Sequence, residues 1–149
     1  LEIQIVDIDS IIEEREGNTV PNIFADKGED YFRKVENICM QDVSELDRVV
    51  VSTGGGGPIS CSNRHIMRSS GLVIWLKAPA KTIYERLVDS VGEEEIKKGR
   101  PVLSSENPFS RISELLKSRE RFYSEADIHV NTENKTPEFV ALEIIRKIR

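Results

Sequence analysis

Val49-Val50-Val51-Ser52-Thr53-Gly54-Gly55-Gly56-Gly57 is the stretch of this sequence that decides its fold. Three consecutive valines form the continuous apolar run that is typical of a buried parallel strand, and the glycines that follow have no side chains. At the carboxyl end of such a strand, a loop without side chains lets backbone N–H groups approach an anion. The stretch therefore predicts an α/β protein with an anion-binding loop at Gly54–Gly57.

Segments typical of strands and helices alternate along the rest of the chain. We expect strands at 2–6, 48–52, 72–76 and 127–130, and helices at 10–16, 20–26, 29–46, 62–69, 81–89, 109–122 and 137–148. This alternation predicts one domain over residues 1–149, with a parallel sheet and helices on both of its faces. The segment from about 90 to 108 is charged and rich in glycine, and we expect it to be a functional loop.

The composition excludes several classes of protein. The chain has 149 residues, 38% hydrophobic and 32% charged, with a net charge of -5. A nucleic-acid-binding protein would usually show a basic face, and no apolar run approaches the ~20 residues of a membrane span. Without a signal-peptide pattern we expect a soluble, cytoplasmic monomer whose cysteines, Cys39 and Cys61, are reduced.

Asp7 and Asp9 follow the first predicted strand and are two residues apart. Alternation along a strand would put both carboxylates on one face, at the carboxyl edge of the sheet. Two carboxylates there suit different roles, one beside a divalent cation and one accepting a proton from a hydroxyl. The alternative is that they cap the helix that follows.

Arg33 and Arg100 each allow two interpretations, and a helix end can account for arginines at 119 and 121. Arg33 and Glu36 are spaced for an ion pair on an exposed helix face, or for a guanidinium that Glu36 holds toward a carboxylate. Arg100 is either a solvated charge or a loop residue that closes over a phosphoryl group. Arg119 and Arg121 lie near a helix end, where the helix dipole favours cations in any case.

The order of these motifs is more specific than any one of them. Asp-x-Asp at 7–9 is followed by Phe-Arg-x-x-Glu at 32–36, Thr-Gly-Gly-Gly at 53–56, Arg-Pro-x-Leu at 100–103 and Arg-x-x-x-Tyr at 119–123. This order resembles the shikimate kinase family, within the P-loop nucleoside monophosphate kinase-like group. The resemblance implies a three-layer α/β/α fold. It also implies phosphorylation of the 3-hydroxyl of shikimate by ATP and Mg²⁺, a step of aromatic amino acid biosynthesis.

The resemblance also implies a role for each matching residue. Asp7 corresponds to the carboxylate that holds Mg²⁺, and Asp9 to the residue that binds the acceptor hydroxyl as base or positioning group. Arg100 corresponds to an arginine of a lid over the phosphate, and Arg86, by a looser match, to one that stacks on adenine. The remaining matches concern shikimate: the carboxylate clamp of Arg33 and Arg119 braced by Glu36, the glycines Gly54, Gly55 and Gly56 beside the ring, and the apolar wall of Phe24 and Phe32.

The sequence departs from the family at its start, where a strand and a Gly-x-x-x-x-Gly-Lys-Ser/Thr loop are expected to precede Asp7. Three explanations stay open. The sequence is a piece of a longer kinase, or it is a relative without this loop that binds but does not transfer phosphate. In the third explanation its acceptor is another small molecule, a sugar acid such as gluconate or a nucleotide. Of these, we expect the first, because Leu1 opens almost directly into a strand.

Overall fold

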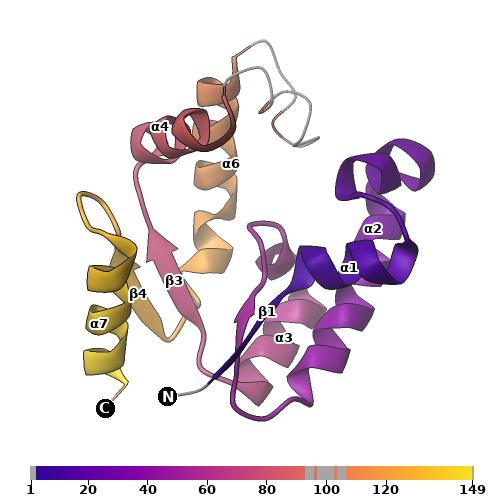
Figure 1. Ribbon diagram of the computed structural model, residues 1–149, viewed down its shortest axis with the longest axis horizontal. Helices are drawn as coiled ribbons and strands as arrows, with labels where there is room; N and C mark the ends of the chain where they lie inside the picture. Colours follow the sequence, from indigo (N-terminus) through magenta and orange to yellow (C-terminus); the bar gives the residue numbers. More distant parts are fainter. Residues whose placement is uncertain (1–2, 93–95, 97–102, 104–106, 149) are drawn as a thin grey trace. The chain divides into compact units, whose positions relative to one another are not determined.

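The computed structural model describes residues 3–92, 96, 103 and 107–148 (Figure 1). The chain divides into two compact units, Leu1–Gly71 and Leu72–Arg149, called unit 1 and unit 2 below. Each unit contains parallel strands with flanking helices, which confirms the predicted α/β class. That residues 1–149 form one domain stays a prediction.

Unit 1 begins with β1 (Gln4–Asp7), which pairs in parallel with β2 (Val49–Ser52). In this register Val6 lies beside Val51, and both side chains pack against the core of the unit. Ile5 lies beside Val50 on the other face of the pair, where both side chains are exposed. The run of valines is therefore a parallel strand as predicted, but unit 1 buries only one of its faces.

Two helices follow β1, and a glycine divides the second. α1 (Ile8–Glu16) ends at Gly17, which adopts the left-handed conformation. α2 (Val20–Ser44) contains Gly28, whose φ of 83° and ψ of 171° are not helical. Because glycine reaches this conformation without strain, α2 consists of two helical segments that meet at Gly28, as the separate predictions for 20–26 and 29–46 anticipated.

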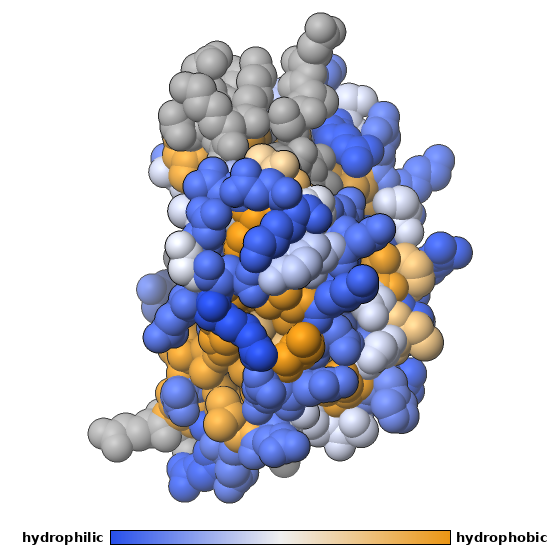
Figure 2. Space-filling view, turned by 90° about the vertical axis from the view of Figure 1, so that its right-hand side faces the viewer, coloured by the Kyte–Doolittle hydropathy of each residue, from blue (hydrophilic) through white to orange (hydrophobic). Residues whose placement is uncertain are grey.

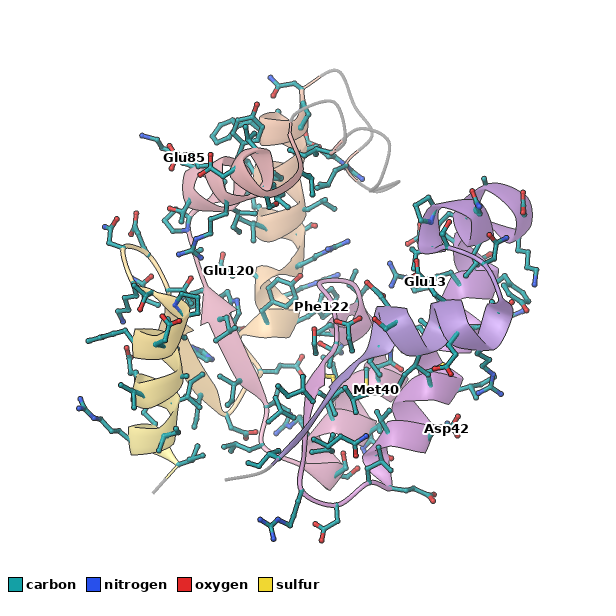
Figure 3. The ribbon with its side chains drawn as sticks, in the orientation of Figure 1. Glu13, Met40, Asp42, Glu85, Glu120 and Phe122 are labelled. Atoms are coloured by element: carbon teal, nitrogen blue, oxygen red, sulfur yellow. The ribbon has the colours of Figure 1, made fainter. Side chains whose placement is uncertain are left out.

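The core of unit 1 forms where α1 and α2 pack on β1. Arg15 of α1 donates to Asp42 of α2 at 3.0 Å, and the Glu13 carboxylate accepts from the Val20 N–H at 2.8 Å (Figure 3). These contacts hold the two helices together at the rim of the core. The buried core residues are Val6, Ile8, Ile12, Ile23, Phe32, Val35, Cys39, Met40 and Val43.

The glycine loop after β2 leads into a short 3-10 helix, η1 (Gly57–Ile59), and then α3 (Cys61–Ser70). Ser60 caps α3, since its hydroxyl accepts from the Asn63 N–H at 3.4 Å. Met40, labelled in Figure 3, lies beneath the loop, and its methyl carbon is 3.6 Å from where a Cβ of Gly57 would be. The loop is thus supported from below by the core of unit 1.

Unit 2 contains β3 (Ile74–Lys77) and β4 (Ile128–Asn131), which pair in parallel. α4 (Ala80–Val91) packs on α6 (Pro108–Tyr123), while α7 (Pro137–Lys147) lies beside β4 (Figure 1). Trp75 of β3 and His129 of β4 are register partners, with ring centroids 5.2 Å apart. Helix and strand alternate here as the sequence predicted.

A small apolar core lies between α4 and α6. Its buried side chains are Ile96, Leu103 and Ile112, and partly buried residues of both helices surround them. Two residues of the predicted loop at 90–108 are thus anchored in unit 2. The other residues between Gly92 and Asn107, among them Arg100, lie outside the described residues.

Hydrophilic side chains predominate on the face shown in Figure 2, with smaller hydrophobic areas between them. This distribution agrees with the 32% of charged residues in the sequence. Among the residues that the structure describes, no helix combines the length and apolar character that crossing a membrane requires.

Candidate active site

Asp7 caps the first helix of unit 1. It has extended backbone angles, and its Oδ1 accepts from the Ser10 N–H at 3.0 Å and from the Ser10 hydroxyl at 3.4 Å. The capping alternative is therefore confirmed for Asp7. The prediction that strand alternation places Asp7 and Asp9 on one face is wrong, because the strand ends at Asp7 and Asp9 lies in the first turn of α1.

The Asp7 carboxylate is ionised at neutral pH. Partial burial raises its pKa, but hydrogen bonds from Ser10, Ser52 and the Asp9 backbone outweigh that effect, so the pKa lies below its ordinary value. Among the described residues, no three His, Cys, Asp or Glu side chains gather into a metal site. A single ionised carboxylate fits Mg²⁺, which commonly keeps several waters and takes other ligands from phosphates.

Asp9 faces the glycine loop. A Cβ added at Gly54 would lie 3.6 Å from Oδ2 of Asp9 and 3.8 Å from Oδ1. Gly54 has a φ of 66°, a left-handed conformation that favours glycine. The loop thus turns sharply beside the Asp9 carboxylate, and this brings α1 and the carboxyl end of β2 together.

Arg33 reaches the other end of the same turn. A Cβ added at Gly56 would overlap the Arg33 guanidinium, at 2.7 Å from Nη2 and 2.9 Å from Cζ. Gly56 has an ordinary φ of -91°, so any strain from a side chain here would come from this close approach and not from the backbone. Asp9 and Arg33 therefore lie against the two ends of Gly54–Gly56.

Two carboxylates hold the Arg33 guanidinium. Nη1 donates to both oxygens of Glu36, at 2.9 and 3.0 Å, while Nε and Nη2 donate to Oε1 of Glu29, at 3.4 and 3.2 Å. The Glu36 side chain is only 2% exposed and that of Arg33 is 23% exposed. The alternative of a surface ion pair is therefore wrong, since one partner is fully buried.

The remaining donors of Arg33 suit an anion with two oxygens. A guanidinium carries five N–H groups, and Nε, Nη1 and Nη2 each give at least one to Glu29 or Glu36. At most two N–H groups remain, one on each terminal nitrogen. Such a pair matches the geometry of a carboxylate.

Phe24 and Phe32 form an aromatic pair beside Arg33. Their ring centroids are 4.7 Å apart, and Cζ of Arg33 lies 5.3 Å from the centroid of Phe32. Phe32 belongs to the buried core, and Phe24 is partly buried against it. The predicted apolar wall thus lies next to the guanidinium.

The other predicted residues lie in unit 2. Nη1 and Nη2 of Arg86 donate to the hydroxyl and the carbonyl of Thr132, at 3.0 and 2.6 Å. Arg119 lies near the end of α6, next to Glu120 and three residues before Phe122, which Figure 3 labels. Arg100 lies outside the described residues. The structure therefore brings together Asp9, Arg33, Glu36, Gly54 and Gly56, with Phe24, Phe32 and Asp7 on the same unit.

Three residues that contact or support predicted site residues, Glu29, Asn63 and Thr132, were not predicted. Glu29 is one turn before Arg33, and this helical spacing was a signal for their pairing. Asn63 is fully buried beneath the loop. Its spacing from Ile66 and Met67 places it on the inner face of α3, a signal that the sequence also carried. Thr132 offered no such signal, because 46 residues separate it from Arg86.

Comparison with known proteins shows close similarity to one family. A family model described as shikimate kinase matches residues 1–149. A shikimate kinase from Persephonella marina is 38% identical over 149 residues, which are 100% of this chain and 85% of the relative. A shikimate kinase from Sulfurihydrogenibium sp. is 36% identical over 149 residues, 100% of this chain and 84% of the relative.

Solved structures agree with these sequence matches. A shikimate kinase from Acinetobacter baumannii in complex with shikimate superposes with a TM-score of 0.88 and 30% identity, covering 98% of this chain and 78% of the other. The shikimate kinase from Aquifex aeolicus gives a TM-score of 0.80 and 38% identity, covering 98% and 81%. The described units therefore have the fold of these kinases, the three-layer α/β/α class that the sequence predicted.

Proposed function

Because this chain belongs to the shikimate kinase family, we propose that it transfers the γ-phosphoryl group of ATP to the 3-hydroxyl of shikimate. The products are shikimate 3-phosphate and ADP. The family supports a phosphotransferase that uses ATP as its donor. The roles of single residues, and the use of Mg²⁺, are our proposals.

One observation carries the assignment of the acceptor site. Asp9 and Arg33 come from different helices, yet both lie against the turn of Gly54–Gly56. The Asp9 carboxylate can accept the proton of a hydroxyl, and the Arg33 guanidinium can donate to a carboxylate. Shikimate carries a hydroxyl and a carboxylate, whereas a nucleobase acceptor would call for a larger polar pocket.

Arg33 binds the carboxylate of the acceptor in this proposal. Each of its terminal nitrogens has at most one further N–H group, the pair that a bidentate contact would use, while Glu29 and Glu36 fix the plane of the guanidinium. Phe24 and Phe32 cover the apolar side of the ring. We assign Arg119 as the second arginine of the clamp, on the resemblance of Arg119 and Tyr123 to the family motif.

Asp9 acts at the reacting oxygen. Its carboxylate accepts the proton of the 3-hydroxyl as that oxygen bonds to the γ-phosphorus, and the bond from this phosphorus to the β–γ bridging oxygen breaks to release ADP. Gly54, Gly55 and Gly56 let the ring and the γ-phosphate approach the backbone closely. In phosphoryl transfer, positioning and charge stabilisation provide most of the rate enhancement.

The nucleotide is bound through unit 2 and Asp7 in this proposal. Arg86 stacks on adenine, and Arg100 closes over the phosphates and excludes water. Asp7 would hold Mg²⁺, which when bound neutralises charge on the phosphate oxygens. We further propose that the protein is a monomer of the cytoplasm.

Two measurements on the chain test the function. Titration calorimetry with shikimate measures acceptor binding, and ADP release from MgATP measures phosphoryl transfer with shikimate or gluconate as the acceptor. We expect the chain to bind shikimate, and ADP release to depend on shikimate when the Gly-x-x-x-x-Gly-Lys-Ser/Thr loop of the family is supplied ahead of Asp7. Binding without ADP release even with that loop present would support a binding protein, and a preference for gluconate would reassign the acceptor.

A further inference from the structure

Asn63 is a fully buried polar side chain that has no role in the reaction proposed above. Its relative exposure is 0%, and it lies in the first turn of α3, directly after the glycine loop and η1. A buried amide that lacks hydrogen-bond partners destabilises the fold, so the contacts of Asn63 matter to the structure around it. Those contacts are all with parts of the acceptor site or its surroundings.

The contacts of Asn63 fix the orientation of its amide. Nδ2 donates to the Gly57 carbonyl at 3.0 Å and, over a longer 3.5 Å, to Oε2 of Glu36. Oδ1 accepts from Nδ2 of Asn37 at 2.6 Å. With the amide reversed, its oxygen would face a carbonyl and a carboxylate, neither of which can donate. The NH₂ group therefore faces the site.

The neighbouring residue fixes the same part of the loop. Nη1 of Arg64 donates to the carbonyls of Pro58 and Ile59, at 3.0 and 2.9 Å. Asn63 donates to the carbonyl of Gly57, so the side chains of these two adjacent residues bind the three consecutive carbonyls of residues 57–59. The end of the glycine loop is thus fastened to the start of α3.

Asn63 also reaches the carboxylate that holds Arg33. Oε2 of Glu36 accepts from Nδ2 of Asn63 and from Nη1 of Arg33. The NH₂ group of Asn63 also donates to the carbonyl of Gly57, the residue after the glycine on which the guanidinium lies. Asn63 therefore links both surfaces between which Arg33 is held, the buried carboxylate and the glycine loop.

We propose that Asn63 is a positioning residue, which aligns Arg33 for the carboxylate of the acceptor by holding Glu36 and Gly57 at a fixed separation. This inference deepens the proposed function and depends on it. Asn63 itself touches no substrate. Loss of its NH₂ group should let Glu36 and the loop move apart, so that the terminal nitrogens of Arg33 no longer meet both oxygens of a carboxylate.

The test is the affinity ratio for shikimate over its methyl ester, which lacks the charged carboxylate. Both are titrated by calorimetry into the full chain and into Asn63→Ser. If Arg33 loses alignment, we expect the affinity ratio to fall about tenfold, because only the charged ligand gains from a bidentate contact with the guanidinium. A variant that merely unfolds in part binds fewer equivalents of both ligands and keeps the ratio.

A core variant controls for stability. Val43 is buried in the same unit, on α2, two turns beyond Glu36. Val43→Ala should lower the thermal midpoint about as much as Asn63→Ser and leave the affinity ratio unchanged. Equal ratios in the wild type, Asn63→Ser and Val43→Ala would overturn the proposed role of Asn63, although shikimate binding by the wild type would still support the function.

A third variant distinguishes hydrogen bonding from packing. Asn63→Asp keeps the shape of the side chain but replaces the NH₂ group by an oxygen facing Glu36 and Gly57. We expect its ratio at pH 8 to be no higher than that of Asn63→Ser, because like charges repel. A ratio near that of the wild type would mean that only the volume of Asn63 matters and would overturn the proposal. If the wild type itself fails to bind shikimate, the proposed function and this inference both fall.

Discussion

Arg33 in unit 1 and Arg86 in unit 2 are both held by neighbouring oxygens, but those oxygens are charged at Arg33 and neutral at Arg86. Carboxylates of Glu29 and Glu36 hold Arg33, and they engage all three of its nitrogens. Arg86 is held by neutral oxygens, the hydroxyl and the carbonyl of Thr132, which bind both terminal nitrogens. The two guanidinium groups therefore differ in which contacts they can offer a ligand, N–H groups at Arg33 and a flat face at Arg86.

This difference in partners indicates which ligand each arginine suits. Arg33 can keep one N–H on each terminal nitrogen, which matches the two oxygens of a carboxylate. The terminal nitrogens of Arg86 are already directed at Thr132, while the residue remains exposed, so a flat face is the surface it offers. A planar cation of this kind stacks well on an aromatic ring, which is the contact we propose with adenine.

The largest effect is expected from Arg33→Ala. Loss of a bidentate, charge-assisted contact should raise the Kd for shikimate about 100-fold by calorimetry. The same change removes the guanidinium partner of the buried Glu36 carboxylate, so the free energy of unfolding should fall by about 3 kcal/mol. Arg33→Lys keeps the charge but not the fork, and should recover most of the stability and little of the affinity. Full affinity in Arg33→Lys would show that the fork is not used.

The next largest effect should come from Gly56→Ala, because its Cβ would displace the Arg33 guanidinium. We expect the Kd for shikimate to rise about 20-fold, with a much smaller change in the KM for ATP. Gly71→Ala is the control, since Gly71 has open space around it and an extended φ of -167°. An equal effect of both substitutions would contradict the close contact between the loop and Arg33.

The two carboxylates on Arg33 provide a comparison within the site. Glu36→Gln removes the buried partner and should raise the Kd for shikimate about fivefold, because the guanidinium loses its fixed anion. Glu29 is 60% exposed, so Glu29→Gln should change the Kd less than about twofold. Calorimetry on both variants measures the two Kd values for shikimate. A larger effect at Glu29 would mean that burial is not what gives Glu36 its importance.

The smallest effect is expected from Thr132→Val, which removes one of the two oxygens that hold Arg86. The carbonyl of residue 132 still accepts, so we expect the KM for ATP to rise only about threefold. The Kd for shikimate, measured on the same variant, should stay at the wild-type value. A change in shikimate affinity instead would contradict the separate roles of the two arginines.

Much of the secondary structure followed from local sequence patterns. The run of valines before Gly54 formed a parallel strand, and Gly28 divided α2 between the two predicted helical segments. The pairing of Arg33 with Glu36 was also predictable, since residues three apart on a helix are neighbours. The first helix began earlier than predicted, because the Asp7 side chain caps it and draws Ile8 and Asp9 into its first turn.

Periodicity and the order of motifs along the chain were enough to predict the α/β class, the family and most residues of the proposed site. The burial of Glu36, the close approach of Gly56 to Arg33 and the bonds of Asn63 to Glu36 and Gly57 became visible only in the folded chain. Burial and close approach arise when segments distant in the chain pack together. The pattern within any one segment does not contain that information.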